Sequence, residues 1–183
     1  MSCTSLRITS GDCRGRKITT PGGSTHPMGD RERLALFNAI SEVLRGADVL
    51  DLYAGSGALG LEALSRGAAK AVFVEKDRKA ANCILENIRE LGYESRATVL
   101  QGDVRVALHS GGLPQEIFDI ILCDPPYDHF DLNEFSMAVD YLEPGGLLVL
   151  SHPSEQPPAF FDLALKSTKK YAGAHLSFYE KNN

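Results

Sequence analysis

The chain has 183 residues, of which 43% are hydrophobic and 23% are charged, and its formal net charge at pH 7 is −5. These values are typical of a globular protein with one substantial core. No apolar stretch approaches the length of a membrane span, and the first residues lack the apolar segment of a signal peptide. We therefore expect a cytoplasmic protein with no membrane contact.

The first element in chain order is a small hairpin, predicted from the short β-like pieces around glycines in residues 6–23. Residues 1–33 carry six Lys or Arg against three Asp or Glu, so this end is basic although the whole chain is acidic. From Asp30 to Leu44 apolar residues recur at helical spacing, and Asp30 is placed as the N-cap. We divide the chain into a basic hairpin arm, residues 1–29, and a main domain, residues 30–183.

After this helix, short β-type segments alternate with helical ones. The predicted strands cover residues 47–53, 70–77, 97–103, 118–124 and 145–152, and the predicted helices cover 58–67, 78–92 and about 132–142. Repeated βαβ order predicts a five-stranded parallel core. Two last strands, near 164–171 and 175–180, are joined by a short turn and should pair antiparallel at the edge. The predicted fold is α/β, with a mostly parallel seven-stranded sheet, a C-terminal antiparallel hairpin and an N-terminal β-hairpin arm.

Cysteine and histidine residues form no metal-binding pattern. Cys3, Cys13, Cys83 and Cys123 are scattered without CxxC spacing, and the five histidines show no HxxxH spacing. We therefore expect neither disulfide bonds nor structural zinc, and no metal in the functional site.

A glycine motif lies between the first main-domain strand and the next helix. Gly55, Gly57 and Gly60 have GxGxxG spacing, and Glu75 follows Gly55 by 20 residues. This is formally the dinucleotide-binding fingerprint, in which glycines let the backbone approach a ligand and an acid holds a ribose hydroxyl. The motif alone is also compatible with a tight strand-to-helix turn that binds nothing.

Four acids fall near the ends of four successive strands. They are Asp51, Glu75, Asp103 and Asp124. The carboxyl ends of parallel strands share one edge of a sheet, which is where ligands bind. A pyrophosphate would meet several carboxylates there, whereas S-adenosylmethionine carries a sulfonium, an ammonium and ribose hydroxyls that suit acidic partners. The acids therefore favour S-adenosylmethionine over NAD, although Asp103 taken alone could simply cap the next helix.

The motifs DLYAGSG, VFVEKD, QGD and DPPY, in that order, resemble the successive motifs of the Rossmann-like class I methyltransferases. The resemblance implies that Asp51, Gly55 and Gly57 face the methionine part of the cofactor, Glu75 the ribose and Asp103 the adenine. The full set of cofactor-binding residues that we expect is Asp51, Ala54, Gly55, Gly57, Glu75, Lys76, Asp103, Val104 and Asp124.

DPPY, residues 124–127, resembles the signature of enzymes that methylate an exocyclic amine of a base. The lone pair of such an amine is delocalised into the ring, so the amine is a poor nucleophile. The Asp124 carboxylate and the Pro125 carbonyl could accept its two hydrogens and stabilise its developing charge. Two prolines would hold that carbonyl in place, and Tyr127 offers a flat face for an extruded base. We expect Asp124, Pro125 and Tyr127 to form the catalytic set.

The arm sequences RITSGDCRGRKI and HPMGDRERLALFN, together with LYAGSGALGLEALSRGA and the closing KYAGAHLSFYEK, resemble the RsmD-type bacterial enzymes, which methylate guanine N2 of small-subunit (16S) ribosomal RNA. The family pattern reads Arg-Pro-Thr near His26 to Met28 and has Glu near Leu34, so the chain departs from it there. Only matching positions are carried over as RNA-binding residues: Arg7, Arg14, Arg16, Lys17 and Arg31.

The resemblance implies transfer of a methyl group from S-adenosylmethionine, which becomes S-adenosylhomocysteine, to a guanine N2 amine of ribosomal RNA. The substrate would be a small ribosomal subunit or an assembly intermediate, and the enzyme a monomer. An adenine-N6 methyltransferase acting on DNA or RNA is the alternative, because DPPY serves both amines. A non-catalytic cofactor-binding protein and a small-molecule methyltransferase are further alternatives, against which the intact DPPY and the basic arm respectively argue.

Overall fold

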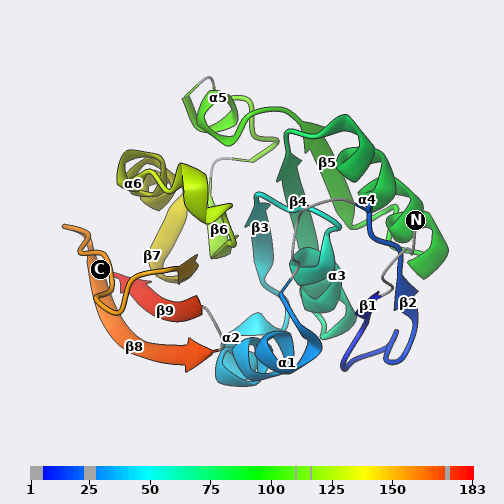
Figure 1. The fold of residues 1–183 in the computed structure, drawn as a ribbon, viewed down its shortest axis with the longest axis horizontal. Helices are drawn as coiled ribbons and strands as arrows, with labels where there is room; N and C mark the ends of the chain where they lie inside the picture. The colour runs from blue at the N-terminus through cyan, green and yellow to red at the C-terminus, as the bar shows by residue number, and fades with distance from the viewer. Residues whose placement is uncertain (1–5, 23–27, 110, 116, 172–173) are drawn as a thin grey trace.

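The computed structural model describes residues 6–22, 28–109, 111–115, 117–171 and 174–183 (Figure 1). Within them, a seven-stranded sheet has the order β5-β4-β3-β6-β7-β9-β8. Its strands are β3 (Asp48–Leu52), β4 (Lys70–Glu75), β5 (Ala97–Gln101), β6 (Phe118–Cys123), β7 (Leu142–His152), β8 (Leu163–Tyr171) and β9 (Ala174–Lys181). The strands from β5 to β7 pair parallel, and β9 pairs antiparallel with both β7 and β8. The predicted mostly parallel sheet with its C-terminal hairpin is confirmed.

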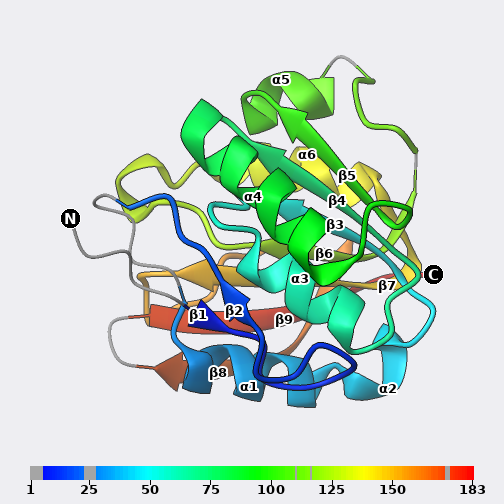
Figure 2. The ribbon, with the colours of Figure 1, turned by 90° about the vertical axis from the view of Figure 1, so that its right-hand side faces the viewer.

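Helices cover both faces of this sheet. They are α1 (Asp30–Ala39), α2 (Ser41–Leu44), α3 (Ala58–Ser65), α4 (Arg78–Leu91), α5 (Val104–His109) and α6 (Leu132–Asp140). Alternate strand residues face opposite sides. Val49 and Phe73 join a core cluster with α1, α3 and α4, whereas Leu50 and Val72 join one with α5 and α6. Figure 2 shows α3 and α4 lying across one side of the strands.

Several predicted boundaries are wrong. Gly29, and not Asp30, is the N-cap of α1; Asp30 is the first helical residue, and its carboxylate accepts from Arg33 at 2.7 Å. The helix expected to reach Leu44 is interrupted at Ile40, between α1 and α2. Helix α5 was not predicted, because its six residues are too few to show a period. β7 begins at Leu142, because a bulge accommodates the Pro-Gly-Gly segment that suggested a loop.

The N-terminal segment forms the expected hairpin, with β1 (Leu6–Arg7) antiparallel to β2 (Lys17–Ile18). Ile8 and Ile18 are fully buried in the core cluster that contains residues of α1, α3 and α4. The Thr19 N–H also donates to the Asn87 side chain of α4 at 2.9 Å. The hairpin therefore packs on the helices that cover the sheet. The division of the chain into an arm and a main domain at residue 29 stays a prediction.

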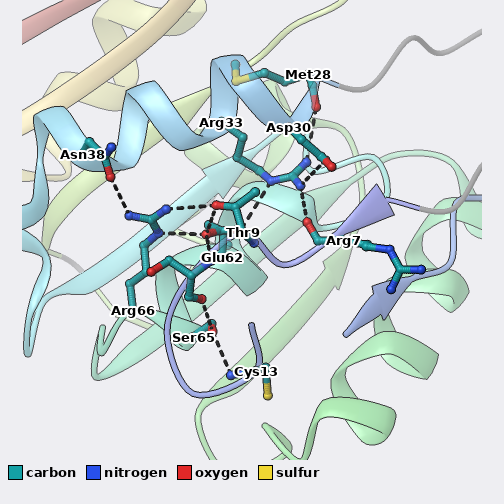
Figure 3. Close-up of polar contacts among 12 residues, drawn as sticks. Arg7, Thr9, Cys13, Met28, Asp30, Arg33, Asn38, Glu62, Ser65 and Arg66 are labelled. Atoms are coloured by element: carbon teal, nitrogen blue, oxygen red, sulfur yellow. Dashed lines mark hydrogen bonds and ion pairs between the residues drawn. The ribbon is translucent and has the colours of Figure 1, made fainter. Parts of the chain in front are cut away.

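A buried ionic cluster joins the hairpin to α1 and α3 (Figure 3). The Glu62 carboxylate of α3 is fully buried and accepts from Arg66 Nε at 2.8 Å and from Arg33 Nε at 3.4 Å. It also accepts from the Thr9 hydroxyl at 2.6 Å and from the Thr9 N–H at 2.8 Å. Arg33, itself fully buried, donates to the carbonyl oxygens of Met28 and Arg7. One carboxylate thus connects three segments that are distant in the sequence.

Candidate active site

The four strand-end acids lie on neighbouring strands. Asp51 is the penultimate residue of β3, Glu75 ends β4, Asp103 follows β5 by two positions and Asp124 directly follows β6. Because β5, β4, β3 and β6 are adjacent and parallel, their carboxyl ends form one edge, and the acids meet there. The structure therefore brings these predicted cofactor residues together.

The glycine loop joins β3 to α3 above this edge. Gly55 has a φ of 56°, which favours glycine, and a Cβ there would meet only the Tyr53 carbonyl oxygen, at 4.0 Å. The loop backbone is thus open on that side. At Gly60, by contrast, a Cβ would lie 2.3 Å from the Phe73 ring, so this glycine allows α3 to pack on the sheet. The motif combines an open turn with a close helix contact, and Gly57 precedes α3 in the left-handed conformation.

Carboxylates support the loop from below. Asp51 is buried and accepts from the Gly60 N–H at 2.9 Å. Burial raises the pKa of Asp51 well above its usual range, and the nearby charges of Asp124 and Glu75 raise it further. Glu75 accepts from the N–H groups of Gly55 and Asp77, each at 2.7 Å. The loop and the acids are therefore one hydrogen-bonded unit.

Asp103 lies at the far end of the same edge. Its carboxylate accepts from Lys76 Nζ at 2.9 Å and from the Arg105 N–H at 3.1 Å. The hydrogen bond with Lys76 lowers the pKa of Asp103 and raises that of Lys76. Asp103 is thus compatible with both roles considered from the sequence, a helix cap and a cofactor ligand, because it caps α5 and also lies at the edge of the sheet. Val104, which begins α5, and Ala54 in the glycine loop are buried.

The DPPY segment turns away from β6 into a single 3-10 turn, η1 (Tyr127–His129). Pro125 is buried, whereas Tyr127 is 37% exposed. The Tyr127 hydroxyl lies 2.8 Å from the hydroxyl of Ser151. Burial raises the pKa of Asp124, and a hydrogen bond from Ser151 opposes that rise. The predicted catalytic residues therefore lie beside the edge where the four acids meet, with Ser151 as an additional hydrogen-bond partner of Tyr127.

Two features of the site were missed in the sequence. Tyr53 adopts a φ of 60°, a left-handed conformation that is uncommon for a residue other than glycine. Its hydroxyl donates to Glu134 of α6, and its ring meets the Phe135 ring edge-on at 6.3 Å. Ser151 is the second. Its position near the end of the predicted strand 145–152, which points to the same edge, was a usable signal, whereas nothing in the sequence indicates the backbone of Tyr53.

The predicted RNA-binding residues divide into two groups. Arg7, Arg14 and Arg31 line one open hollow between the hairpin and α1, together with the apolar Ile8 and Leu34. Arg16 donates instead to the Glu90 carbonyl of α4, and Lys17 is exposed on β2. Leu34, where the chain departs from the family pattern, thus lies in the hollow. Met28 lies at the other place where the chain departs from the family pattern, and its carbonyl oxygen accepts from Arg33. His26 lies outside the described residues.

The described residues hold no group of three or more His, Cys, Asp or Glu side chains that could bind a metal ion. In the same ranges, no helix combines the length and the apolar character that crossing a bilayer requires.

The fold is that of the Rossmann-like methyltransferases. Residues 6–180 match the family described as Conserved hypothetical protein 95. The chain is 38% identical over 144 residues to Ribosomal RNA small subunit methyltransferase D of Escherichia coli K12, covering 78% of this chain and 69% of that protein. It is 32% identical over 157 residues to the protein of the same name from Haemophilus influenzae, covering 83% and 81%.

A solved structure agrees with these relatives. That of yhhF from Escherichia coli superposes with a TM-score of 0.85 at 32% identity, covering 98% of this chain and 99% of the other. The chain therefore belongs to the RsmD-type methyltransferase family, and the resemblance seen in its motifs is confirmed.

Proposed function

We propose that the chain transfers a methyl group from S-adenosylmethionine to the N2 amine of a guanine in small-subunit (16S) ribosomal RNA. The observation that supports this most is the position of the DPPY loop. Asp124 and Tyr127 lie beside an edge with three further acids and an open glycine loop, so a target amine and a cationic cofactor would meet there. Relatives that share the family are named as methyltransferases of small-subunit ribosomal RNA.

The residues at the edge fit S-adenosylmethionine. This cofactor supplies an electrophilic methyl group on a positively charged sulfur. Asp51 provides a buried carboxyl group under the glycine loop, where it accepts from the Gly60 N–H, and Glu75 can accept from ribose hydroxyls. Asp103, half-buried at the end of the edge, can accept from an adenine amine. Ala54, Gly55, Gly57, Lys76 and Val104 complete the proposed binding set.

The DPPY loop would act on the target amine. The Asp124 carboxylate and the Pro125 carbonyl would each accept one amine hydrogen, so that the nitrogen lone pair points at the methyl group. Because a carboxylate that is already in place stabilises the charge developing on nitrogen, the effect falls mainly on the transition state. The half-exposed Tyr127 ring would stack on the base.

The arginine-lined hollow supplies a place for the RNA backbone. Arg7, Arg14 and Arg31 present positive charge from two elements, the hairpin and α1. Phosphate contacts of this kind provide affinity without sequence preference. Recognition of the target would then depend on the shape of a folded RNA site, in a small subunit or an assembly intermediate in the cytoplasm. One copy of the chain holds all the residues required, so we propose that it acts as a monomer.

Replacing Glu75 with alanine should weaken binding of S-adenosylmethionine. The hydrogen bonds to ribose hydroxyls that this variant cannot make correspond to about 1 to 3 kcal/mol, which is about 5- to 150-fold in Kd. Isothermal titration calorimetry measures this directly. Glu86→Ala, on the exposed face of α4, is the control and should bind normally. Unchanged affinity in Glu75→Ala would remove Glu75 from the site.

Replacing Arg14 and Arg31 together with alanine should weaken RNA binding and reduce its salt dependence. Removing one arginine–phosphate ion pair lowers the slope of log K against log salt by about 1. Fluorescence anisotropy with a small-subunit RNA fragment, measured over a salt series, checks the slope. Arg45→Ala removes an exposed arginine beyond the end of α2 and should keep it. A full slope in the double variant would show that the hollow does not bind phosphates.

The proposed activity is tested by identifying the methylated nucleoside. The purified protein would be incubated with isotope-labelled S-adenosylmethionine and either free small-subunit RNA or small-subunit particles lacking the modification. Digestion and mass spectrometry should find the label in N2-methylguanosine. Label in N6-methyladenosine would instead support the adenine alternative, and no transfer to either RNA would contradict a ribosomal RNA substrate.

A further inference from the structure

Ser151 lies beside two side chains of the DPPY loop, those of Asp124 and Tyr127. It is the penultimate residue of β7 and is only 2% exposed. β6 and β7 are parallel, and Cys123 pairs with Leu150. The next residues along each strand, Asp124 and Ser151, are therefore neighbours at the edge of the site. The Ser151 hydroxyl lies 2.8 Å from the Tyr127 hydroxyl, and it is near enough to the Asp124 carboxyl group to lower the pKa of that group.

The hydrogen bonds that Tyr127, Ser151 and Asp124 can make with one another follow from the number of available protons. A serine hydroxyl has one hydrogen and two lone pairs, and an ionised carboxylate can only accept. If Asp124 is ionised, Ser151 donates its hydrogen to Asp124 and accepts from the Tyr127 hydroxyl. The three groups then form a chain from Tyr127 through Ser151 to Asp124, in which every donor has an acceptor.

We infer that Ser151 is a positioning residue of the methyl transfer reaction, which holds the Asp124 carboxylate and the Tyr127 ring in the arrangement that receives the target amine. This inference depends on the proposed function, because it assigns Asp124 the role of amine acceptor. Ser151 touches neither the base nor the cofactor in this account; it acts through its two partners.

The surroundings of Asp124 make this hydrogen bond important for its charge. Burial raises the pKa of Asp124, and the Ser151 hydrogen bond lowers it. The other titratable groups that interact with Asp124 are Asp51 on β3, Cys123 on β6 and Tyr127 on η1. Glu75 on β4 in turn faces Asp51. None of these four groups can carry a positive charge, so none of them favours the ionised form of Asp124. The Ser151 hydroxyl does favour that form.

Removing the hydroxyl should therefore raise the pKa of Asp124. If the reaction requires ionised Asp124, activity is lost as the pH falls through that pKa. The acid limb of the pH profile should then move to higher pH in Ser151→Ala. A loss of general stability would lower the rate without moving this limb, so the pH profile separates the two explanations.

The test compares Ser151→Ala with Ser177→Ala as a matched control. Ser177 is a fully buried serine on the adjacent strand β9, bonded to His152 and Thr168. In single-turnover methyl transfer to small-subunit particles, Ser151→Ala should lose about 10- to 100-fold in rate at neutral pH, as expected for a hydrogen bond to a charged group. Its acid limb should move upward, whereas Ser177→Ala should keep the parent profile. The carboxyl carbon of Asp124, followed by NMR in the protein alone, should titrate at higher pH in Ser151→Ala.

A double variant tests the chain of hydrogen bonds. Tyr127→Phe keeps the ring but removes the hydroxyl that donates to Ser151, so it should lose only a small part of the rate, and this small loss should largely disappear in the Ser151→Ala background. If Ser151→Ala fails to bind cofactor, Ser151→Cys, whose thiol is somewhat larger than the hydroxyl and donates only weakly, takes its place. If Ser151→Ala has the parent rate and an unmoved acid limb, the inference about Ser151 is overturned. If Asp124→Ala is also fully active, the proposed mechanism itself fails, so the Asp124 variant distinguishes the two failures.

Discussion

Asp124→Ala should reduce turnover about 100- to 1000-fold, the usual effect of removing one preorganised group that stabilises transition-state charge. Asp124 directly follows β6 and lies at the edge where the acids meet. Its proposed hydrogen bond strengthens as the amine nitrogen becomes positive. The affinity for cofactor and RNA should therefore change much less than the rate.

Single-turnover methyl transfer to small-subunit particles measures this effect, and calorimetry with cofactor verifies folding. Asp128→Ala is a matched control, because Asp128 is exposed on the same loop and should be dispensable. Tyr127→Ala should cost less than Asp124→Ala, since stacking on a base is worth about 1 to 3 kcal/mol, and Tyr127→Phe should keep most activity. Turnover at the parent rate in Asp124→Ala would contradict the mechanism.

Glu62→Ala should lower the free energy of unfolding by about 3 to 5 kcal/mol, because removing one partner leaves buried charge uncompensated. Arg33 is fully buried and the Arg66 side chain is 10% exposed, so neither guanidinium can turn freely to water. The Thr9 and Ser10 N–H groups would also lose their acceptor. The hairpin should then be held less firmly on α3.

Urea unfolding followed by circular dichroism measures the loss. Glu42→Ala, an exposed acid of α2, should change stability by less than about 0.5 kcal/mol and serves as the control. Limited proteolysis of Glu62→Ala under native conditions should cut the hairpin sooner than in the parent. A change below about 1 kcal/mol would show that the cluster does not anchor the hairpin.

The sheet could be predicted because its strands are short, apolar and separated by helical segments. The acids at the ends of β3, β4 and β6 were placed for the same reason, since each follows or ends an apolar run. The conformation of Tyr53 was not predictable, because a positive φ at a tyrosine is imposed by its surroundings, here Glu134 and Phe135. The sequence could place Ser151 near the end of a strand at this edge, but its position beside Asp124 depends on the register of β6 against β7, which the sequence does not contain.

The sequence contains one indication of the buried charge that anchors the hairpin. Glu62 is a single acid in the apolar segment ALGLEALS. Every residue of α3 is buried, so this acid had to find buried partners. Their identity depends on tertiary contacts: Arg33 follows the start of α1 by three residues and looks like an ordinary surface arginine in the sequence. The ionic cluster therefore became evident only in the structure.

The most direct test of the proposed function is mass mapping of methylated nucleotides in small-subunit ribosomal RNA from cells with and without this protein. We expect one N2-methylguanosine to be absent from cells that lack it. The parent chain should restore that nucleotide, and Asp124→Ala should not. An unchanged set of methylated guanines in small-subunit RNA, or the loss of an N6-methyladenosine in its place, would contradict the account.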